Sequence, residues 1–327
     1  MDVDDKSQPE TLLMKTHSPF PRFIGAVLQI SLLAVSLPKL AAADTGQVFT
    51  TPEEAVTALG RAVSATNRVV LAAILGPASA QLVNPDEVQG AQELGQFAEA
   101  FNATNRLVRE SDTRMTLEVG NNAWPFPIPL VKVAAGWQFD TAAGIEELLN
   151  RRIGRNELEV LRVMRAYVQA QREYASRDRD GDEVLEYAQK ISSSPGRTDG
   201  LFWPPEVNGE VSPLGPLFAY AQGEGYFAEA PEADAGPQPF HGYFFKILTR
   251  QDQHAPGGKH DYVINGNMIA GFAMVAWPAE YGDSGVMTFI VNQQGRVYQK
   301  DLKEGTAKIV QKMTAYDPGE DWQVSPD

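Results

Sequence analysis

The sequence predicts an α+β protein made of two consecutive units. Helical periodicity gives way to alternating, strand-like patterns twice along the chain, once in each half. One long amphipathic helical pattern separates the two sets of strands. These observations predict three parts: a processing segment at 1–43, a first α+β domain at 44–150, and a helix-plus-sheet domain at 151–327.

The amino-acid composition excludes several classes of function before any motif is considered. The 327 residues are 43% hydrophobic and 21% charged, which is sufficient for a sizeable core. Asp and Glu total 42 against 28 Lys and Arg, so the net charge of −14 disfavours nucleic acid and anionic membrane as partners. With 0 cysteines, the chain has no disulfide, thiol nucleophile or thiolate metal site.

The N-terminal part has the pattern of a secretory signal peptide. An apolar run from 23 to 37 follows Lys15 and Arg22, and the small residues 41–43 come after it. The run is too short for a membrane span, which needs about 20 residues. The acidic stretch before Met14 is unusual for such a signal, so Met14 is the expected true start. We therefore expect an exported protein, periplasmic or secreted, with no membrane span after cleavage; an uncleaved N-terminal anchor is the alternative.

In the first domain, helices precede strands. Thr51, Pro52 and Glu54 form a helix start with a cap, a proline at the first helical position and a capping-box glutamate. Later patterns predict helices at about 67–75 and 88–103 and strands at 106–110, 115–119, 124–131 and 136–140. Three prolines in 124–131 make that strand an edge or a bulged one.

This order resembles the cone-shaped fold of nuclear-transport-factor-2-like domains over 49–140. Such cones often enclose an apolar pocket, and four aromatic residues are its candidate lining: Trp124, Phe126, Trp137 and Phe139. The alternative is that these side chains belong to the core.

The middle of the chain predicts a short helix at 142–149 and a longer one at about 156–176. The apolar face of the longer helix requires a partner, for which the following sheet is the best candidate. Strand patterns at 242–249, 270–277, 285–291 and 296–300 predict that antiparallel sheet. A long helix laid on such a sheet resembles the globular part of type IV pilin-like proteins.

An acidic loop follows the long helix. Asp178, Asp180 and Asp182 fall at the first, third and fifth positions of a calcium loop, where carboxylates converge on one hard cation. Val184 would add a backbone carbonyl and Glu186 a later carboxylate. Glu183 stands where such loops favour glycine, and a glutamine stands in place of the final glutamate. Calcium is thus one hypothesis, and a solvated turn in which Asp178 and Asp180 pair with Arg177 and Arg179 is the other.

Several motifs in order resemble the bacterial exported family called domain of unknown function 2950. They are Trp-Pro-Phe-Pro-Ile-Pro at 124–129, Gly-Trp-Gln-Phe-Asp-Thr at 136–141, Arg-Ile-Gly-Arg-Asn-Glu-Leu at 152–158, Asp-Arg-Asp-Gly-Asp at 178–182, Ser-Pro-Leu-Gly-Pro at 212–216, His-Gly-Tyr-Phe-Phe at 241–245, Ala-Trp-Pro-Ala-Glu-Tyr-Gly at 276–282 and Ser-Gly-Val-Met-Thr-Phe at 284–289. The resemblance covers nearly all of the chain after residue 43. It implies export and a common architecture but no assigned activity.

Residues with catalytic potential form no convincing set. Gly-Asp-Ser-Gly at 282–285, with His241 and Asp261, echoes a serine-protease triad but lacks the surrounding motifs and more often forms a turn. His241, His254, His260 and Asp261 do not have the spacing of a compact zinc site. Asp199, Glu280 and Asp283 are candidate carboxylates for glycoside hydrolysis, whose separation the sequence does not set.

We therefore expect a non-catalytic binding or structural module of the cell envelope, with an envelope protein or small ligand as its partner. A calcium ion at the acidic loop is compatible with this role. The alternative is a hydrolase that uses carboxylates or His241.

Overall fold

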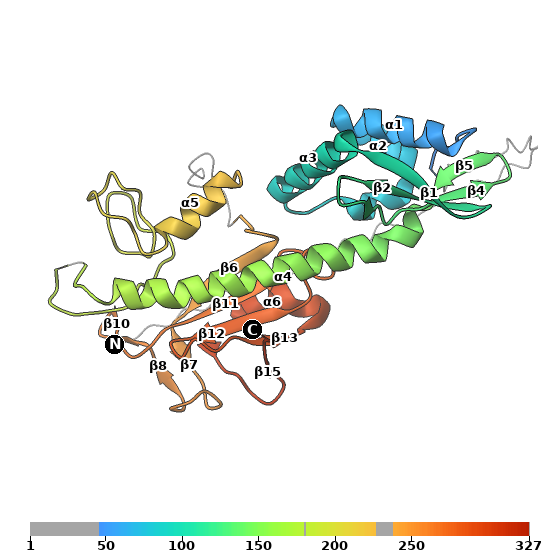
Figure 1. Ribbon diagram of the computed structural model, residues 1–327. Coiled ribbons are helices and arrows are strands. Elements are labelled where there is room, and N and C mark those ends of the chain that lie inside the picture. The colour runs from blue at the N-terminus through green and yellow to red at the C-terminus, as the bar shows by residue number, and fades with distance from the viewer. Residues whose placement is uncertain (1–45, 180, 227–237, 327) are drawn as a thin grey trace, which may run out of the picture. The chain divides into compact units, whose positions relative to one another are not determined.

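The computed structural model describes residues 46–179, 181–226 and 238–326. The predicted signal peptide at 1–43 lies outside these residues. Helices and antiparallel sheets alternate along the described chain, which confirms the α+β class (Figure 1). Within these ranges, no helix has the length and apolar character needed to cross a membrane.

The first half places three helices before a curved sheet. Its elements are α1 (Pro52–Ser64), α2 (Arg68–Leu75), the 3-10 helix η1 (Pro77–Leu82), α3 (Glu87–Ala103), β1 (Asn105–Ser111), β2 (Arg114–Val119), β3 (Trp124–Pro125), β4 (Leu130–Val133) and β5 (Gly136–Phe139). The sheet order is β1-β2-β4-β5, with β3 also paired to β2. The prolines limit 124–131 to two short strands, as the removal of backbone donors requires.

Local signals account for the start of α1. The Thr51 hydroxyl accepts from the Glu54 amide at 3.2 Å, and Pro52 occupies the first turn. The Glu54 carboxylate accepts from the amide of Thr50 at 3.0 Å rather than from Thr51, so the capping box closes one residue earlier than predicted. The helix then buries its apolar face against the sheet.

The middle of the chain is one helix, α4 (Thr141–Tyr174). The prediction of separate helices at 142–149 and 156–176 was wrong, because the polar stretch between them stays helical. The predicted domain boundary at 150 falls inside α4, so one helix belongs to both halves.

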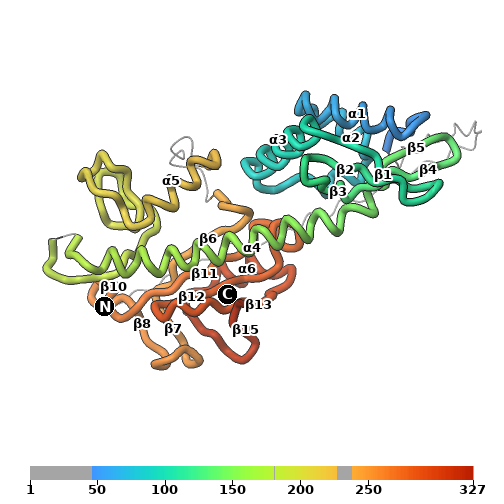
Figure 2. Tube along the Cα trace, viewed as in Figure 1, coloured from blue at the N-terminus to red at the C-terminus, as the bar shows by residue number. Residues whose placement is uncertain are grey.

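The second half continues with α5 (Gly215–Gly223) and a sheet of five antiparallel strands in the order β15-β13-β12-β11-β6. The strands are β6 (Tyr243–Leu248), β11 (Ala273–Pro278), β12 (Thr288–Asn292), β13 (Tyr298–Lys300) and β15 (Gln323–Val324). The smaller elements are β7 (Arg250–Gln251), β8 (His260–Asp261), β9 (Val263–Ile264), β10 (Asn267–Met268), η2 (Lys303–Gly305), α6 (Thr306–Lys312) and β14 (Ala315–Tyr316). Figure 2 follows the same path as a tube.

Helices cover both faces of the five-stranded sheet. Phe245 of β6 packs against the buried cluster that includes Val163 of α4, whereas its neighbour Lys246 donates to the Val310 carbonyl of α6. Adjacent strand residues point to opposite faces, so α4 and α6 lie on opposite sides of the sheet. The central strand β12 is accordingly buried along its whole length. This confirms a helix laid on an antiparallel sheet, as the sequence predicts.

Candidate functional site: a buried polar junction

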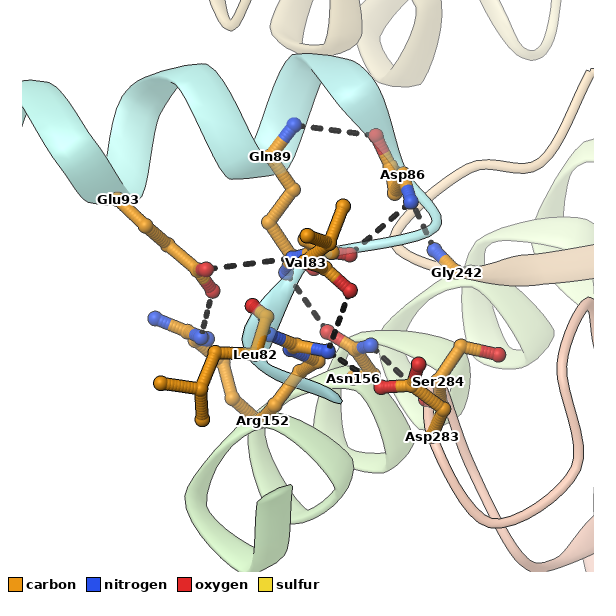
Figure 3. Close-up of polar contacts among 12 residues, drawn as sticks. Leu82, Val83, Asp86, Gln89, Glu93, Arg152, Asn156, Gly242, Asp283 and Ser284 are labelled. Atoms are coloured by element: carbon orange, nitrogen blue, oxygen red, sulfur yellow. Dashed lines mark hydrogen bonds and ion pairs between the residues drawn. The ribbon is translucent and has the colours of Figure 1, made fainter. Parts of the chain in front are cut away.

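The middle of α4 carries two buried polar side chains, Arg152 and Asn156. Asn156 is fully buried. Its Oδ1 accepts from Nε2 of Gln89 on α3 at 2.7 Å, and its Nδ2 donates to the Ser284 carbonyl at 2.9 Å (Figure 3). One amide thus joins α3, α4 and the loop that precedes β12. We call the group of Asp86, Gln89, Arg152, Asn156 and Ser284 the polar junction.

Asp86 connects the start of α3 to the segment before β6. Its Oδ1 accepts from the Gln89 amide at 3.0 Å and so caps the helix. Its Oδ2 accepts from the Tyr226 hydroxyl at 2.7 Å and from the Gly242 amide at 3.1 Å. Burial and the bond to the Asp86 carboxylate raise the pKa of Tyr226 far above its ordinary value, so the phenol remains a proton donor.

Arg152 adds a buried charge to the polar junction. It donates to the Leu82 carbonyl at 2.6 Å and to the Val83 carbonyl at 3.4 Å, and it forms an ion pair with Asp283. The guanidinium has five N–H donors in a planar fork, which suits it to satisfy several acceptors at once. One arginine therefore connects η1 and its following residue to the loop before β12.

The Gly-Asp-Ser-Gly motif forms a turn at this junction. The Ser284 hydroxyl donates to the Glu280 carbonyl at 3.1 Å and accepts from the Glu280 amide at 3.0 Å. Asp283 pairs with Arg152, and Asp261 lies near Arg250 at 3.5 Å. Of the protease hypothesis, Asp261 and Ser284 therefore have separate partners, and Ser284 is fully buried.

His241 lies beside the polar junction in a strained conformation. Its φ is +47°, a left-handed value uncommon outside glycine. Its ring packs against Tyr226 and Phe240, with centroids 5.3 and 4.4 Å apart. Nε2 lies 2.9 Å from a Glu224 carboxylate oxygen, but the angles are not those of a hydrogen bond. This close pair of a buried histidine and a partly exposed glutamate is the strongest observation in favour of proton-transfer chemistry.

The other candidate catalytic or zinc residues are distributed over the second half. Asp199 accepts from Lys190 at 2.7 Å and from the Ser194 amide at 2.7 Å. His254 lies 3.0 Å from Asp317, and Nδ1 of His260 lies 3.1 Å from the Gly258 carbonyl. Among the residues that the structure describes, no three His, Asp or Glu side chains are placed to hold a metal.

The acidic loop has an ordered backbone around its carboxylates. Asp178 accepts from the amides of Gly181 and Glu183 at 2.7 and 2.9 Å. Asp182 accepts from the Val184 amide at 2.8 Å and from Asn267 at 2.6 Å. In the same loop, Glu186 accepts from the Met268 amide at 3.0 Å. Asp180 lies outside the described residues, so the full set of predicted calcium ligands remains a prediction.

Two further details of this loop bear on the hypotheses. Glu183 has a φ of +68°, so it adopts the conformation for which calcium loops favour glycine. Arg177 and Arg179 both reach Glu210, at 3.2 and 3.5 Å, which gives these arginines a partner that the solvated-turn hypothesis did not include.

The four aromatic residues of the predicted pocket pack within the first half. Trp137 and Phe139 are buried and Trp124 and Phe126 are partly buried. Phe126 lies between Phe97 and Phe139, with ring centroids at 5.1 and 6.3 Å. The contacts are those of a core cluster, and a ligand at these rings remains a prediction.

The sequence did not single out the polar junction as a site. Arg152 and Asn156 were noted only as part of a family motif, and Asp86 and Gln89 were not noted at all. Their signal is polar residues at positions that the helical period assigns to the buried face. This signal can be interpreted only when the distant partners of these residues are known.

Fold and site together define a class: an α+β protein whose two five-stranded sheets are connected through one long helix and a buried polar junction. A family model described as Protein of unknown function (DUF2950) matches residues 46–325, so the chain belongs to this family. No curated protein and no solved structure matches the chain.

Proposed function

We propose that this protein is an exported, non-catalytic binding or structural module of the cell envelope. The observation that carries the proposal is that polar side chains able to take part in catalysis are instead used to hold the fold together. Asp86, Asn156 and Ser284 all hold backbone or side-chain groups in the polar junction. A catalytic group needs an atom within reach of a substrate, and these groups are committed to the fold.

Export is supported by the signal-peptide pattern at 1–43. The proposal includes a calcium ion at the acidic loop. The glycine-like backbone of Glu183 and the convergence of amides on Asp178 support it.

The competing function is a hydrolase, favoured by the close His241–Glu224 pair. The test is a screen of ester, glycoside and peptide substrates on the full chain and on His241→Ala and Asp199→Ala. We expect no turnover above the blank. Turnover that disappears in His241→Ala but persists in His254→Ala, the matched exposed histidine, would overturn the binding proposal.

Binding and location need their own measurements. Cell fractionation should place the protein outside the cytoplasm, and an immobilised sample should retain a specific component of envelope extract. A cytoplasmic location, or retention no greater than that on an unrelated acidic protein, would contradict the proposal.

A further inference from the structure

The strand β1 is an open edge of the first sheet, because it pairs with β2 alone. The opposite edge, β5, is partly covered by Phe49, whose amide and carbonyl bond with Trp137 at 2.8 and 2.7 Å. On the second sheet, the β6 edge is partly covered by Phe240, which bonds with Tyr243 in the same way at 2.9 and 3.1 Å. With 7 residues, most of them exposed, β1 is the longest edge strand of the two five-stranded sheets.

The outer side of β1 presents unpaired backbone groups. The Leu117 carbonyl of β2 accepts from the Phe126 amide at 2.8 Å, so Leu117 points its backbone groups away from β1. Leu107 lies opposite Leu117, and the two therefore form a non-hydrogen-bonded pair. Because such pairs alternate along an antiparallel ladder, Asn105, Leu107 and Arg109 all point their N–H and C=O groups away from β2. Among the described residues, no hydrogen bond reaches these amides and carbonyls.

The charges of the hairpin formed by β1 and β2 balance one another. Each arginine of the hairpin forms an ion pair with an acidic residue of the same hairpin: Arg106 with Glu118 at 2.6 Å, Arg109 with Asp112 at 3.2 Å, and Arg114 with Glu110 at 2.8 Å. Residues 105–119 therefore carry no net charge, although the whole chain carries −14. Two copies of so acidic a chain repel each other, and a neutral edge is where they can approach most closely.

We propose that β1 pairs with β1 of a second copy, in antiparallel order about a two-fold axis at Leu107. In this register Leu107 faces its counterpart, and Asn105 of each copy faces Arg109 of the other. All the outward amides and carbonyls then gain partners. No arginine lies directly opposite another, since Arg106 faces Val108. The bulge after Arg109 ends the regular stretch, so the pairing is confined to residues 105–109. Self-association of this kind goes beyond the proposed function and does not depend on it.

The test is sedimentation velocity of the full chain over a concentration series. The series should bracket a dissociation constant on the order of 100 µM, the strength of a small, transient interface. We expect the dimer fraction to rise with concentration. Added salt should strengthen the dimer, because it screens the repulsion between two chains of charge −14.

Matched variants separate the backbone from the side chain. Arg109→Pro removes an outward N–H without removing a bond to β2, so it should weaken the dimer at least tenfold. Arg109→Ala loses the same side chain and ion pair but keeps the N–H, so it should dimerise like the wild type. Asn105→Pro and Asn105→Ala form a second pair, which decides the result if Arg109→Pro does not fold. Thr104 already has the extended conformation that precedes a proline, with φ −164° and ψ 147°.

A single introduced cysteine can report the register, because the chain has 0 cysteines. Leu107→Cys should form an intermolecular disulfide on mild oxidation, since paired Cα atoms at this position would lie about 5.5 Å apart. Ser111→Cys, beyond the bulge, should cross-link far more slowly. Equal cross-linking rates would overturn the register.

A monomer at every concentration would overturn the inference, and so would a dimer that both proline variants form as strongly as the wild type. One further outcome separates this inference from the proposed function. If the wild type stays monomeric, and Arg109→Pro but not Arg109→Ala fails to retain an envelope component, then the edge binds a strand of another protein. Self-association is wrong in that case, and the proposed function stands.

Discussion

Asn156→Ala should destabilise the protein strongly, because one fully buried amide connects α3, α4 and the loop before β12. The substitution leaves the Nε2 donor of Gln89 and the carbonyl of Ser284 without their partner. An unsatisfied buried donor or acceptor costs about 1–3 kcal/mol, so the two together should lower the free energy of unfolding by about 2–6 kcal/mol.

The assay is urea unfolding of the full chain, followed by circular dichroism and by tryptophan fluorescence. Asn102→Ala is the control, because Asn102 is an exposed asparagine on α3; it should change stability by no more than about 0.5 kcal/mol. Asn156→Asp keeps the shape but replaces the donor to Ser284 with a buried carboxylate oxygen, so it should destabilise at least as much.

A double-mutant cycle with Gln89→Ala isolates the bond itself. Groups in direct contact show interaction energies of about 0.5–3 kcal/mol. A loss below about 1 kcal/mol in Asn156→Ala would refute the reasoning that this amide is buried without alternative partners. A coupling of zero between positions 89 and 156 would show that the hydrogen bond is not formed.

Three further predictions follow from other parts of the chain. Millimolar Ca²⁺ added after EDTA treatment should raise the melting temperature, and Ca²⁺ at 100 times its dissociation constant should add about 2.7 kcal/mol to the free energy of unfolding. An equal shift in Asp180→Ala, or no shift in the wild type, would show that the acidic loop is not a calcium site. Desolvation alone would raise the pKa of Asp199, but hydrogen bonds from Lys190 and Ser194 lower it to about 2. The ionised Asp199 carboxylate therefore stabilises the protein by about 1 kcal/mol above its unfolded-state pKa of about 4, and this stabilisation is lost as the pH falls through 2. Asp199→Asn should accordingly lower the free energy of unfolding least at pH 2, and a loss that does not depend on pH would contradict this. Gly285→Ala should cost about 1–3 kcal/mol because its new Cβ would lie 2.1 Å from the hydroxyl of buried Tyr243. Gly154→Ala on α4, whose new Cβ meets nothing within 4 Å, should instead raise the free energy of unfolding by up to about 1 kcal/mol. Thermal or urea unfolding measures both variants, and equal effects of the two substitutions would contradict the close packing of Gly285 against Tyr243.

Local sequence signals were sufficient to predict many of the helices and strands. Thr51 and Pro52 start α1, and the alternation of β2 buries Met115, Leu117 and Val119 on one face. Such signals depend only on neighbouring residues, so they can be recognised without the tertiary structure. The parallel pair of β7 and β14 was not predicted, because it joins two-residue strands that are distant in sequence.

The break predicted in α4 shows where local reasoning fails. Arg152, Gly154 and Asn156 interrupt the apolar period, which ordinarily indicates an exposed or non-helical segment. In the structure Arg152 and Asn156 are on the buried face, because their partners lie 67 to 131 residues away. A polar residue can be buried only where such partners satisfy it, and nothing next to these positions identifies them. The polar junction was therefore missed for the same reason that α4 was divided.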